Sequence, residues 1–437
     1  MIEKFKHIKN IFKGDKVIWT VFFLLCIISI VEVYSASSFL GYKTGNYIKA
    51  PMYHTGLLLA GIVATVFVLN IKCKYFKLAT PILVPLAVLL LILVFFIGTK
   101  ENDAVRWLKI GFIPIQPSEI AKGAMVLATA QILSAMQTPE GAAPKAMKYI
   151  LITAAFLILP IAPENLSTAA LLSGVVIMMM FIGRVPFAQL GKLISVILVI
   201  GVVTLTLIMT IGKAPSETPE TASADMHATD NGTGTLQNSD EAKKEKGTFY
   251  FITHRFDTWK GRILGFANDE YVPPEKYDLD KNGQVGHANI AIVSSNIYGR
   301  GPGNSIERDF LSQAFSDFIY AIIIEEMGII GAVAVALLYI ILLVRTGIIA
   351  RKCRNPFPAF LAIGLALLMV TQALFNMCVA VGLAPVTGQP LPLISKGGTS
   401  SIINCIYIGV ILSISRTAAR IDEDDIDELD GKAVANA

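Results

Sequence analysis

Long apolar runs recur along this 437-residue chain and constrain its fold more than any other feature. A run of roughly eighteen or more apolar residues can cross about 30 Å of hydrocarbon as a helix. Only 16% of the residues are charged, which is too little to cover a soluble protein of this length, and the mean hydropathy is +0.61. The sequence therefore predicts an all-α integral membrane protein.

Hydropathy predicts about ten transmembrane helices. They are expected near residues 17–36, 52–71, 79–98, 117–136, 148–162, 166–183, 187–212, 317–345, 357–382 and 399–415. A basic stretch before the first run, with Ser35-Ala36-Ser37 after it, also fits a signal peptide. The run is long for a signal peptide and many more follow, so we predict an uncleaved first helix.

Lys and Arg are unequally divided between the two sides of the predicted spans. Segments on the side of the two termini hold eighteen, whereas the short loops on the other side hold six. Cytoplasmic loops of membrane proteins carry this excess of basic residues, so both termini are predicted to be cytoplasmic. The net charge is only +4 and indicates no nucleic-acid partner.

These assignments predict five regions along the chain. A basic cytoplasmic N-terminus precedes helices one to seven, one large extracytoplasmic loop separates helices seven and eight, and an acidic cytoplasmic tail follows helix ten. The regions span residues 1–16, 17–212, 213–316, 317–416 and 417–437. Residues 214–247 of the loop are polar and almost free of large apolar side chains, which predicts disorder.

The predicted outer loop before helix four is rich in chemically active side chains. It holds Arg106-Trp107 and leads into Gln116-Pro117-Ser118-Glu119 with Lys122. Pro in the first turn, an early Glu and an interfacial Trp are typical of a capped membrane helix. The same side chains would also suit an anionic ligand that carries rings. The residues alone leave both interpretations open.

Helix eight carries three carboxylates. Asp317 lies at its predicted outer end, and Glu325-Glu326 fall inside its apolar stretch, where carboxylates are costly and often functional. At 100° per residue, Glu325 would lie about 80° around the helix from Asp317, and Glu326 on the opposite face. The alternative is that each glutamate only pairs with a neighbouring helix.

The segment between helices nine and ten is rich in Pro and Gly, from Pro385 to Ser401, so it cannot be a regular helix. Irregular backbone at a membrane face is tolerated where it is buried in protein or lines a cavity. Ser395 and Lys396, beside two glycines, could present donors to a phosphate. A tight structural turn would account for the same composition.

Taken in order, these motifs resemble the SEDS family (shape, elongation, division and sporulation), the FtsW/RodA glycosyltransferases. The resemblance covers most of the chain. It rests on Val33-Tyr34-Ser35-Ala36-Ser37-Ser38, Arg106-Trp107, Gln116-Pro117-Ser118-Glu119 with Lys122, Tyr298-Gly299-Arg300-Gly301, Ser316-Asp317-Phe318-Ile319, Glu325-Glu326-Met327-Gly328, Gln372, Asn376 and Leu391-Pro392-Leu393-Ile394-Ser395-Lys396-Gly397-Gly398. The first-helix motif and the ending from Asn404 to Arg416 resemble the division branch more than the elongation branch.

The resemblance implies a polymerase of the bacterial cell (inner) membrane that joins lipid II units into glycan strands on the outer side during septal cell-wall synthesis. It implies membrane lipid, a class B penicillin-binding protein transpeptidase and other division proteins as partners. It also implies that Asp317 is the catalytic residue. Three departures from the family pattern are Asn165 in place of a carboxylate, His287-Ala288, and Lys396 in place of a tyrosine.

Such a reaction needs a general base for the attacking hydroxyl and cations for the departing pyrophosphate. Asp317 is the candidate base, and a divalent cation, Mg²⁺ or Mn²⁺, is a possible cofactor. The candidate substrate-binding residues are Arg106, Trp107, Gln116, Ser118, Glu119, Lys122, Glu325, Glu326, Gln372, Asn376, Ser395 and Lys396. A lipid II flippase and a non-catalytic scaffold are the rival functions, and the outer position of Asp317 favours the enzyme.

Overall fold

The computed structural model describes residues 13–37, 49–101, 104–110, 113–211, 248–267, 279–311 and 314–435. The stretch predicted to be disordered, 214–247, lies outside the described residues. The chain divides into two compact units, Met1–Leu190 with Tyr277–Ala437, and Gly191–Lys276. In the second unit, Lys260 Nζ of helix α10 donates a 2.8 Å hydrogen bond to the Met209 carbonyl of α9.

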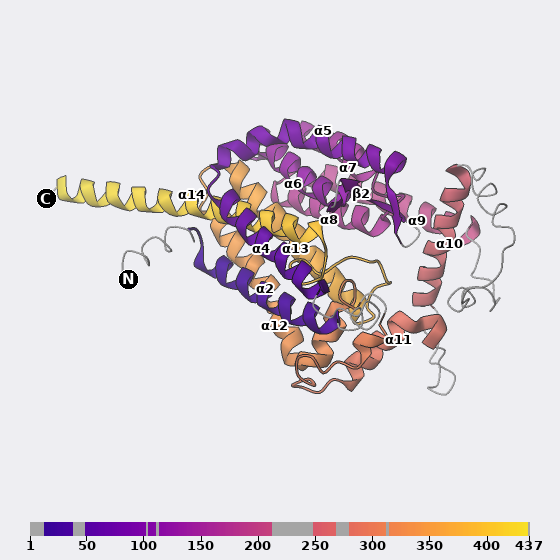
Figure 1. Cartoon of the computed structure of the whole chain (residues 1–437). Helices are drawn as coiled ribbons and strands as arrows, with labels where there is room; N and C mark the ends of the chain where they lie inside the picture. The colour runs from indigo at the N-terminus through magenta and orange to yellow at the C-terminus, as the bar shows by residue number, and fades with distance from the viewer. Residues whose placement is uncertain are drawn as a thin grey trace. The chain divides into compact units, whose positions relative to one another are not determined.

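The described chain is mainly helical (Figure 1). The helices are α2 (Lys16–Ala36), α4 (Lys49–Leu69), α5 (Cys73–Ile97), α6 (Pro117–Ala135), α7 (Lys145–Ile158), α8 (Leu166–Ile182), α9 (Phe187–Ile211), α10 (Thr248–Ala267), α11 (Leu279–Ser294), α12 (Ile319–Arg351), α13 (Pro356–Ala380) and α14 (Thr399–Ala435). The predicted all-α membrane class is confirmed, although the predicted count of ten spans is not. Seven of the described helices are long and apolar enough to cross a membrane.

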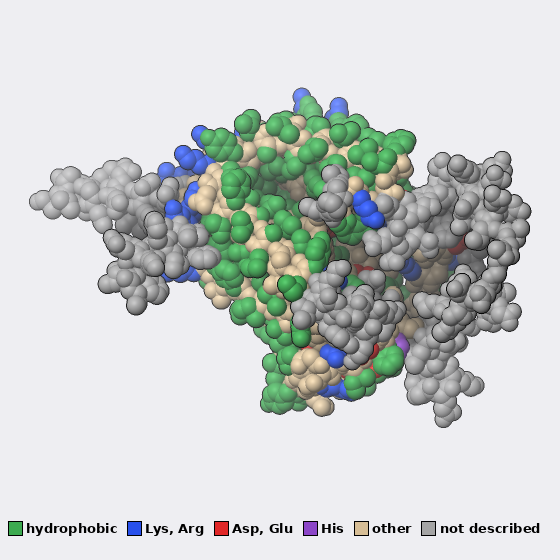
Figure 2. All heavy atoms as spheres, in the orientation of Figure 1, with side chains coloured by type: hydrophobic (Ala, Val, Ile, Leu, Met, Phe, Trp, Pro, Cys, Tyr) green, Lys and Arg blue, Asp and Glu red, His purple; other side chains and the backbone are tan. Residues whose placement is uncertain are grey.

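The outer surface of the first unit is apolar where helices face away from their neighbours. Large hydrophobic side chains are strongly exposed there, among them Val63, Phe67, Ile82 and Phe96. Figure 2 shows hydrophobic side chains over much of the visible face, with Lys and Arg gathered mainly towards the end where α14 is labelled in Figure 1. This distribution is typical of helices in contact with lipid.

Helix α13 lies at the centre of the first unit, where it packs against α6, α8, α12 and α14 (Figure 1). Most of its side chains are buried, including the polar Gln372 and Asn376. Helix α14 packs along α4, and α12 packs along both α2 and α13. The polar groups of α13 are therefore enclosed by protein, where they must find hydrogen-bond partners.

Local sequence determines where several helices begin. Asp15 caps α2, since its Oδ1 accepts from the backbone amides of Val17 and Ile18 at 2.9 and 3.1 Å. Asn165 caps α8 in the same way through the Thr168 amide. Pro117 is at the first turn of α6, as the sequence predicts.

Some elements are not anticipated from the sequence. A small antiparallel sheet, β1 (Thr99–Glu101), β2 (Ala104–Ile110) and β3 (Ile113–Ile115), connects α5 to α6. A two-stranded turn, β4 (Gln137–Thr138) and β5 (Gly141–Ala142), connects α6 to α7. These strands are two to seven residues long, too short to show a period in the sequence.

Helix α12 is interrupted at Gly328, whose φ of 68° and ψ of −171° are not helical. The loop after α11 approaches the helix at this point: Arg300 and Gly301 donate their backbone amides to the carbonyls of Glu325 and Glu326 at 2.9 and 2.8 Å. A Cβ on Gly299 would lie 2.2 Å from the Glu326 carbonyl oxygen, so only glycine permits this approach.

The last helix is longer than the predicted span. Helix α14 continues through the predicted acidic tail to Ala435, whereas the apolar part that could cross a membrane ends at Ala418. The tail contains Ala, Ile, Leu, Asp and Glu without a proline, so helix formation is not interrupted. The boundary at residue 416 is thus a change of polarity within one helix.

Candidate active site

The candidate site lies where α6, α8 and α12 begin and α13 ends, around the irregular loop of residues 381–398. Buried side chains hold the carbonyls of this loop. Asn376 Nδ2 donates to the Gln389 carbonyl at 2.7 Å and Gln372 Nε2 to the Pro390 carbonyl at 2.9 Å. The loop is therefore fixed from beneath by α13, as irregular backbone inside a membrane protein requires.

Asp317 lies in the turn directly before α12, which begins at Ile319. The Asn376 side chain holds the Asp317 carbonyl at 2.8 Å, and the Ser316 hydroxyl donates to Asp317 Oδ1 at 2.9 Å. The Asp317 side chain is partly exposed. A Cβ built on Gly388 would lie 3.4 Å from Asp317 Oδ2, so the 381–398 loop passes directly beside the carboxylate.

Arg106 comes to the same place from strand β2. Its Nε and Nη2 both donate to the carbonyl of Glu164, at 3.1 and 2.9 Å, just before α8 begins. The same built Cβ on Gly388 would lie 4.0 Å from Arg106 Nη1. The guanidinium of Arg106 and the carboxylate of Asp317 therefore both lie beside Gly388, although they are more than two hundred residues apart in sequence.

Lys122 is buried in a polar cluster beneath the loop. It is 1% exposed, and its Nζ contacts Glu119 Oε1 at 2.8 Å and donates to Gln372 Oε1 at 2.7 Å. The Tyr407 hydroxyl donates to the Glu119 carbonyl at 2.9 Å. Sequence analysis suggested that Lys122 binds substrate directly, whereas in this structure its ammonium is enclosed and holds the residue that supports Pro390.

Ser395 and Lys396 are at the far end of the loop. The Ser395 hydroxyl donates to the Ser316 carbonyl at 2.6 Å, which links the loop to the turn that carries Asp317. The Lys396 amide donates to the Phe315 carbonyl at 2.9 Å, and its Nζ lies over the Phe315 ring, 4.6 Å from the centroid. Partial burial lowers the pKa of the Lys396 ammonium.

Glu325 and Glu326 form a separate cluster. The backbone amides of Gly303, Ser305 and Ile306 donate to their carboxylates at 2.9, 3.2 and 3.0 Å. Both glutamates are fully buried and bond to the same 299–306 loop. The rotation of 100° between adjacent residues is accommodated because the loop wraps across the helix where Gly328 interrupts it.

The remaining candidates lie between β2 and α6. Trp107 is half-buried on β2, next to Arg106. Gln116 is the N-cap residue of α6, with the Glu119 amide donating to its carbonyl at 3.1 Å, and Ser118 is in the first turn. The Gln116 side chain makes no cap hydrogen bond, so only Pro117 and Glu119 in the first turn agree with the interpretation of a capped helix start. Trp107 follows Arg106 on β2, and successive side chains of a strand point to opposite faces of the sheet.

Sequence reasoning missed Gln389, which links the loop to α8. Its Nε2 donates to Thr168 Oγ1 at 2.6 Å and to Asn165 Oδ1 at 3.3 Å. The signal was present, since the segment around Asn165 departs from the family pattern and Gln389 is the one amide in the 381–398 loop. Ser29 of α2 was also missed, although its hydroxyl donates to the Ile394 carbonyl at 2.7 Å.

Within the described ranges, no three His, Cys, Asp or Glu side chains come together in a way that could hold a metal ion. A Mg²⁺ or Mn²⁺ ion at Asp317 would therefore take its other ligands from the substrate pyrophosphate and water, the usual arrangement for Mg²⁺. The reaction steps below therefore use only the residues of the chain.

Comparisons with known proteins agree with this fold. The family model of FtsW, RodA and SpoVE, described as cell cycle proteins, matches residues 15–214 and 249–420. The chain therefore belongs to this family of polytopic membrane proteins, which confirms the resemblance read from the motifs.

Similar relatives include a probable peptidoglycan glycosyltransferase FtsW of Geobacter metallireducens, 29% identical over 94% of this chain and 96% of its own. Stage V sporulation protein E of Bacillus subtilis is 28% identical over 90% and 94% of the two chains. The peptidoglycan glycosyltransferase MrdB of Escherichia coli is 24% identical over 92% and 93%.

Two solved structures share the fold. A chain of a peptidoglycan synthase complex, described as coordinating polymerization and crosslinking, aligns with a TM-score of 0.61 at 21% identity, over 93% of this chain and 98% of its own. The rod shape determining protein RodA of Thermus thermophilus aligns with a TM-score of 0.59 at 19% identity, over the same shares of the two chains.

Proposed function

We propose that this protein is a peptidoglycan glycosyltransferase that polymerises lipid II into glycan strands on the outer face of the bacterial cell membrane. Membership of the family and the printed activities of similar relatives support this proposal. The observation that carries it is the placement of Asp317 and Arg106 beside Gly388, with the surrounding backbone fixed by buried amides. A fixed carboxylate beside a fixed cation suits acid–base chemistry on an anionic substrate.

In the proposed reaction, Asp317 removes the proton from a sugar hydroxyl as its oxygen attacks the anomeric carbon of a second lipid-linked unit. The new bond is carbon to oxygen at that carbon. The bond from the anomeric carbon to the pyrophosphate oxygen breaks, and its electron pair leaves on the undecaprenyl pyrophosphate. The proton remains on Asp317 until it passes to solvent.

The leaving pyrophosphate gains negative charge, so cations near it lower the barrier. Arg106 is the first candidate, because Glu164 fixes its guanidinium through two hydrogen bonds. Lys396 is the second candidate, because its ammonium is only half-buried. Trp107, half-buried on the same strand as Arg106, would stack on a sugar ring or on lipid.

The buried candidates act as positioning residues in this proposal. Glu119 and Lys122 orient Gln372, which holds Pro390, whereas Asn376 holds both Asp317 and Gln389. Breaking a buried ion pair typically costs about 3–5 kcal/mol, so loss of either charge in the Glu119–Lys122 pair would disturb the loop.

The proposed orientation places both termini in the cytoplasm and the 381–398 loop outside. It is supported by the excess of Lys and Arg on the side of the termini. A class B penicillin-binding protein transpeptidase is the proposed partner, since a similar fold occurs in a peptidoglycan synthase complex. A septal role, with other division proteins, is supported by relatives named FtsW.

Reconstitution with lipid II tests the activity directly. The purified protein in proteoliposomes, with and without its transpeptidase, should convert labelled lipid II into glycan strands that gel electrophoresis resolves by length. A lipid-flipping assay on the same vesicles provides the contrast. Transbilayer movement of lipid II without any polymer would make the protein a transporter and contradict the proposal.

A further inference from the structure

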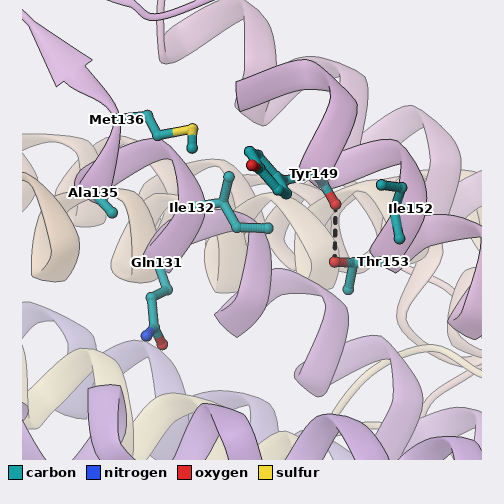
Figure 3. Close-up of a pocket in the computed structure, with 7 residues that line it drawn as sticks. All are labelled: Gln131, Ile132, Ala135, Met136, Tyr149, Ile152 and Thr153. Atoms are coloured by element: carbon teal, nitrogen blue, oxygen red, sulfur yellow. Dashed lines mark hydrogen bonds between the residues drawn. The ribbon is translucent and has the colours of Figure 1, made fainter. Parts of the chain in front are cut away.

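A second concave site lies between α6 and α7, away from the end of the helices that carries Asp317. It is a cavity of about 340 Å³ whose walls come from the last turns of α6 and the first turns of α7. Figure 3 shows residues of the two helices facing one another across it. The walls include Gln131, Ile132, Met136, Tyr149, Ile152 and Thr153.

The cavity opens on the apolar surface of the first unit. Tyr149 and Ile152 are 47% and 45% exposed, so the α7 wall is not covered by another described helix. Most of the lining is apolar, which suits a hydrocarbon chain, whereas the amide of Gln131 adds polarity at one side. A volume near the lower end of typical ligand sites, roughly 300–1,000 Å³, has room for a segment of one chain.

A pair of lysines extends the same wall beyond the cavity. Lys145, Lys148, Tyr149 and Ile152 follow the spacing i, i+3, i+4, i+7, so they form one stripe along α7. Both lysines are exposed. At 1.5 Å per residue, Lys148 lies about 6 Å along the helix axis from Ile152, and Lys145 about 10 Å. A lipid whose chain enters the cavity would thus place its headgroup near the two ammonium groups.

In the first turn of α7 the Ala146 amide donates to the Ala143 carbonyl at 2.8 Å, and the other groups that normally satisfy a helix N-terminus are side chains. Among the described residues no side chain caps it, and it contains no acidic residue. Its two lysines instead add positive charge where the helix dipole already favours an anion. One carboxylate, Glu140, is exposed in the preceding turn, so the balance at this end remains positive. A phosphate would complement both the amides and the lysines.

We propose that this site binds an anionic phospholipid, with its phosphate at Lys145 and Lys148 and one acyl chain between α6 and α7. With the orientation proposed above, the lipid belongs to the cytoplasmic leaflet, the leaflet opposite to that of the Asp317 site. The site would bind membrane lipid independently of the polymerase reaction.

The chain itself provides a matched control. Lys74 and Lys77 form an i, i+3 pair in the first turn of α5, and both are exposed. The two pairs differ because the cavity is lined by α6 and α7, so it lies beside Lys145 and Lys148 of α7 and not beside the α5 pair. General attraction of basic residues to an anionic membrane acts on both pairs, at about 1 kcal/mol per residue. Specific binding at the cavity affects only Lys145 and Lys148.

The test is native mass spectrometry of the full-length protein in detergent, titrated with dioleoyl phosphatidylglycerol or dioleoyl phosphatidylcholine. Wild type should retain one phosphatidylglycerol in preference to phosphatidylcholine. The double variant Lys145→Gln/Lys148→Gln should weaken that binding about 10–30-fold, the combined effect of two surface charges. Lys74→Gln/Lys77→Gln should stay within about two-fold of wild type, because that pair is on α5, the cavity is lined by α6 and α7, and detergent offers no anionic membrane surface.

A second variant tests the chain site independently of charge. Ile152→Trp fills the cavity mouth and should weaken phosphatidylglycerol binding although both lysines remain. Equal losses in the two lysine double variants, or unchanged binding in Ile152→Trp, would overturn the proposal. So would displacement of phosphatidylglycerol by an equal concentration of undecaprenyl phosphate, which would assign the cavity to a polyprenyl chain instead.

Discussion

The Asp317 site and the Glu325–Glu326 cluster show how differently carboxylates of one protein can be used. Asp317 is partly exposed in the turn before α12, beside Gly388 and Arg106. Glu325 and Glu326, two turns further along, are fully buried, and each of their four oxygens accepts a hydrogen bond. All four glutamate oxygens accept hydrogen bonds from this cluster, whereas Asp317 is partly exposed and lies beside Gly388 and Arg106.

The comparison shows that the high desolvation cost of a buried carboxylate does not by itself mean that the carboxylate takes part in the reaction. A carboxylate inside a membrane protein is expensive and therefore suggests function from sequence alone. At Glu325 and Glu326 the cost of removing the carboxylates from water is offset by hydrogen bonds from backbone amides and from the Ser305 hydroxyl. The same bonds hold the 299–306 loop on α12, close to the point where Gly328 interrupts the helix. We therefore infer structural importance for the glutamates and chemical importance for Asp317.

The largest expected effect is at Asp317. Asp317→Asn preserves the shape and the hydrogen bond from Ser316 but removes the base, so lipid II polymerisation should fall by roughly 10²–10⁴. Thermal unfolding in detergent should be unchanged, because the asparagine can keep the same local contacts. A variant that polymerises at near wild-type rate would show that another group is the base, with Glu325 the next to test.

The second prediction concerns Glu326. In Glu326→Gln, an amide NH₂ replaces one carboxylate oxygen. In the wild-type protein these oxygens accept hydrogen bonds from Gly303, Ser305 and Ser35. Hydrogen bonds to charged groups contribute about 1.5–3 kcal/mol, so the unfolding temperature should fall measurably. The rate per folded molecule should stay within a few-fold of wild type. A variant of normal stability that has lost polymerisation would remove the distinction between the two clusters.

The sequence predicts the membrane helices well because each is a long apolar run, whereas α10 and α11 in the predicted outer loop have no such run and are not predicted. Proline at the first turn of α6 and Asp15 before α2 lie where the structure begins those helices. It does not predict the β1–β3 sheet or the break at Gly328. These depend on contacts between segments distant in sequence, such as the approach of Gly299 to the Glu326 carbonyl.

Part of the candidate site could also be predicted from the sequence. Residue types and order indicate Arg106, Asp317 and the 381–398 loop as chemically important, and the structure brings these three together. Sequence cannot tell whether a polar residue faces a substrate or another side chain. Lys122 is an example, since only its partners Glu119 and Gln372 show that it is enclosed.

A smaller effect is expected from closing the space beside Asp317. Gly388 and Gly398 both have positive φ, 71° and 51°, so alanine costs about 1–2 kcal/mol of backbone strain at either position. Only at Gly388 does the added Cβ meet the site, 3.4 Å from Asp317 Oδ2, whereas nothing lies within 4 Å at Gly398. Gly388→Ala should therefore reduce the polymerisation rate several-fold more than Gly398→Ala at similar stability. Equal rates would mean that substrate does not pass Gly388.

The smallest expected effect is a pH dependence from Lys396. Burial lowers its pKa from the ordinary value of 10.5, so it loses its positive charge at a lower pH than an exposed lysine does. A lysine is charged below its pKa and neutral above it. If the ammonium attracts pyrophosphate, the lipid II concentration for half-maximal rate should rise as pH increases through the lowered pKa.

Lys396→Met removes this charge at every pH, so its half-maximal concentration should be higher than that of wild type at neutral pH and should no longer depend on Lys396 titration. The shift should be at most about five-fold, since partly exposed ion pairs contribute about 0.2–1 kcal/mol. Lys109→Met, an exposed lysine on β2, is the control and should keep the wild-type pH profile. A profile of Lys396→Met that matches wild type at all pH values would restrict Lys396 to its contact with the Phe315 ring, and Arg106 would remain as the candidate cation for the leaving group.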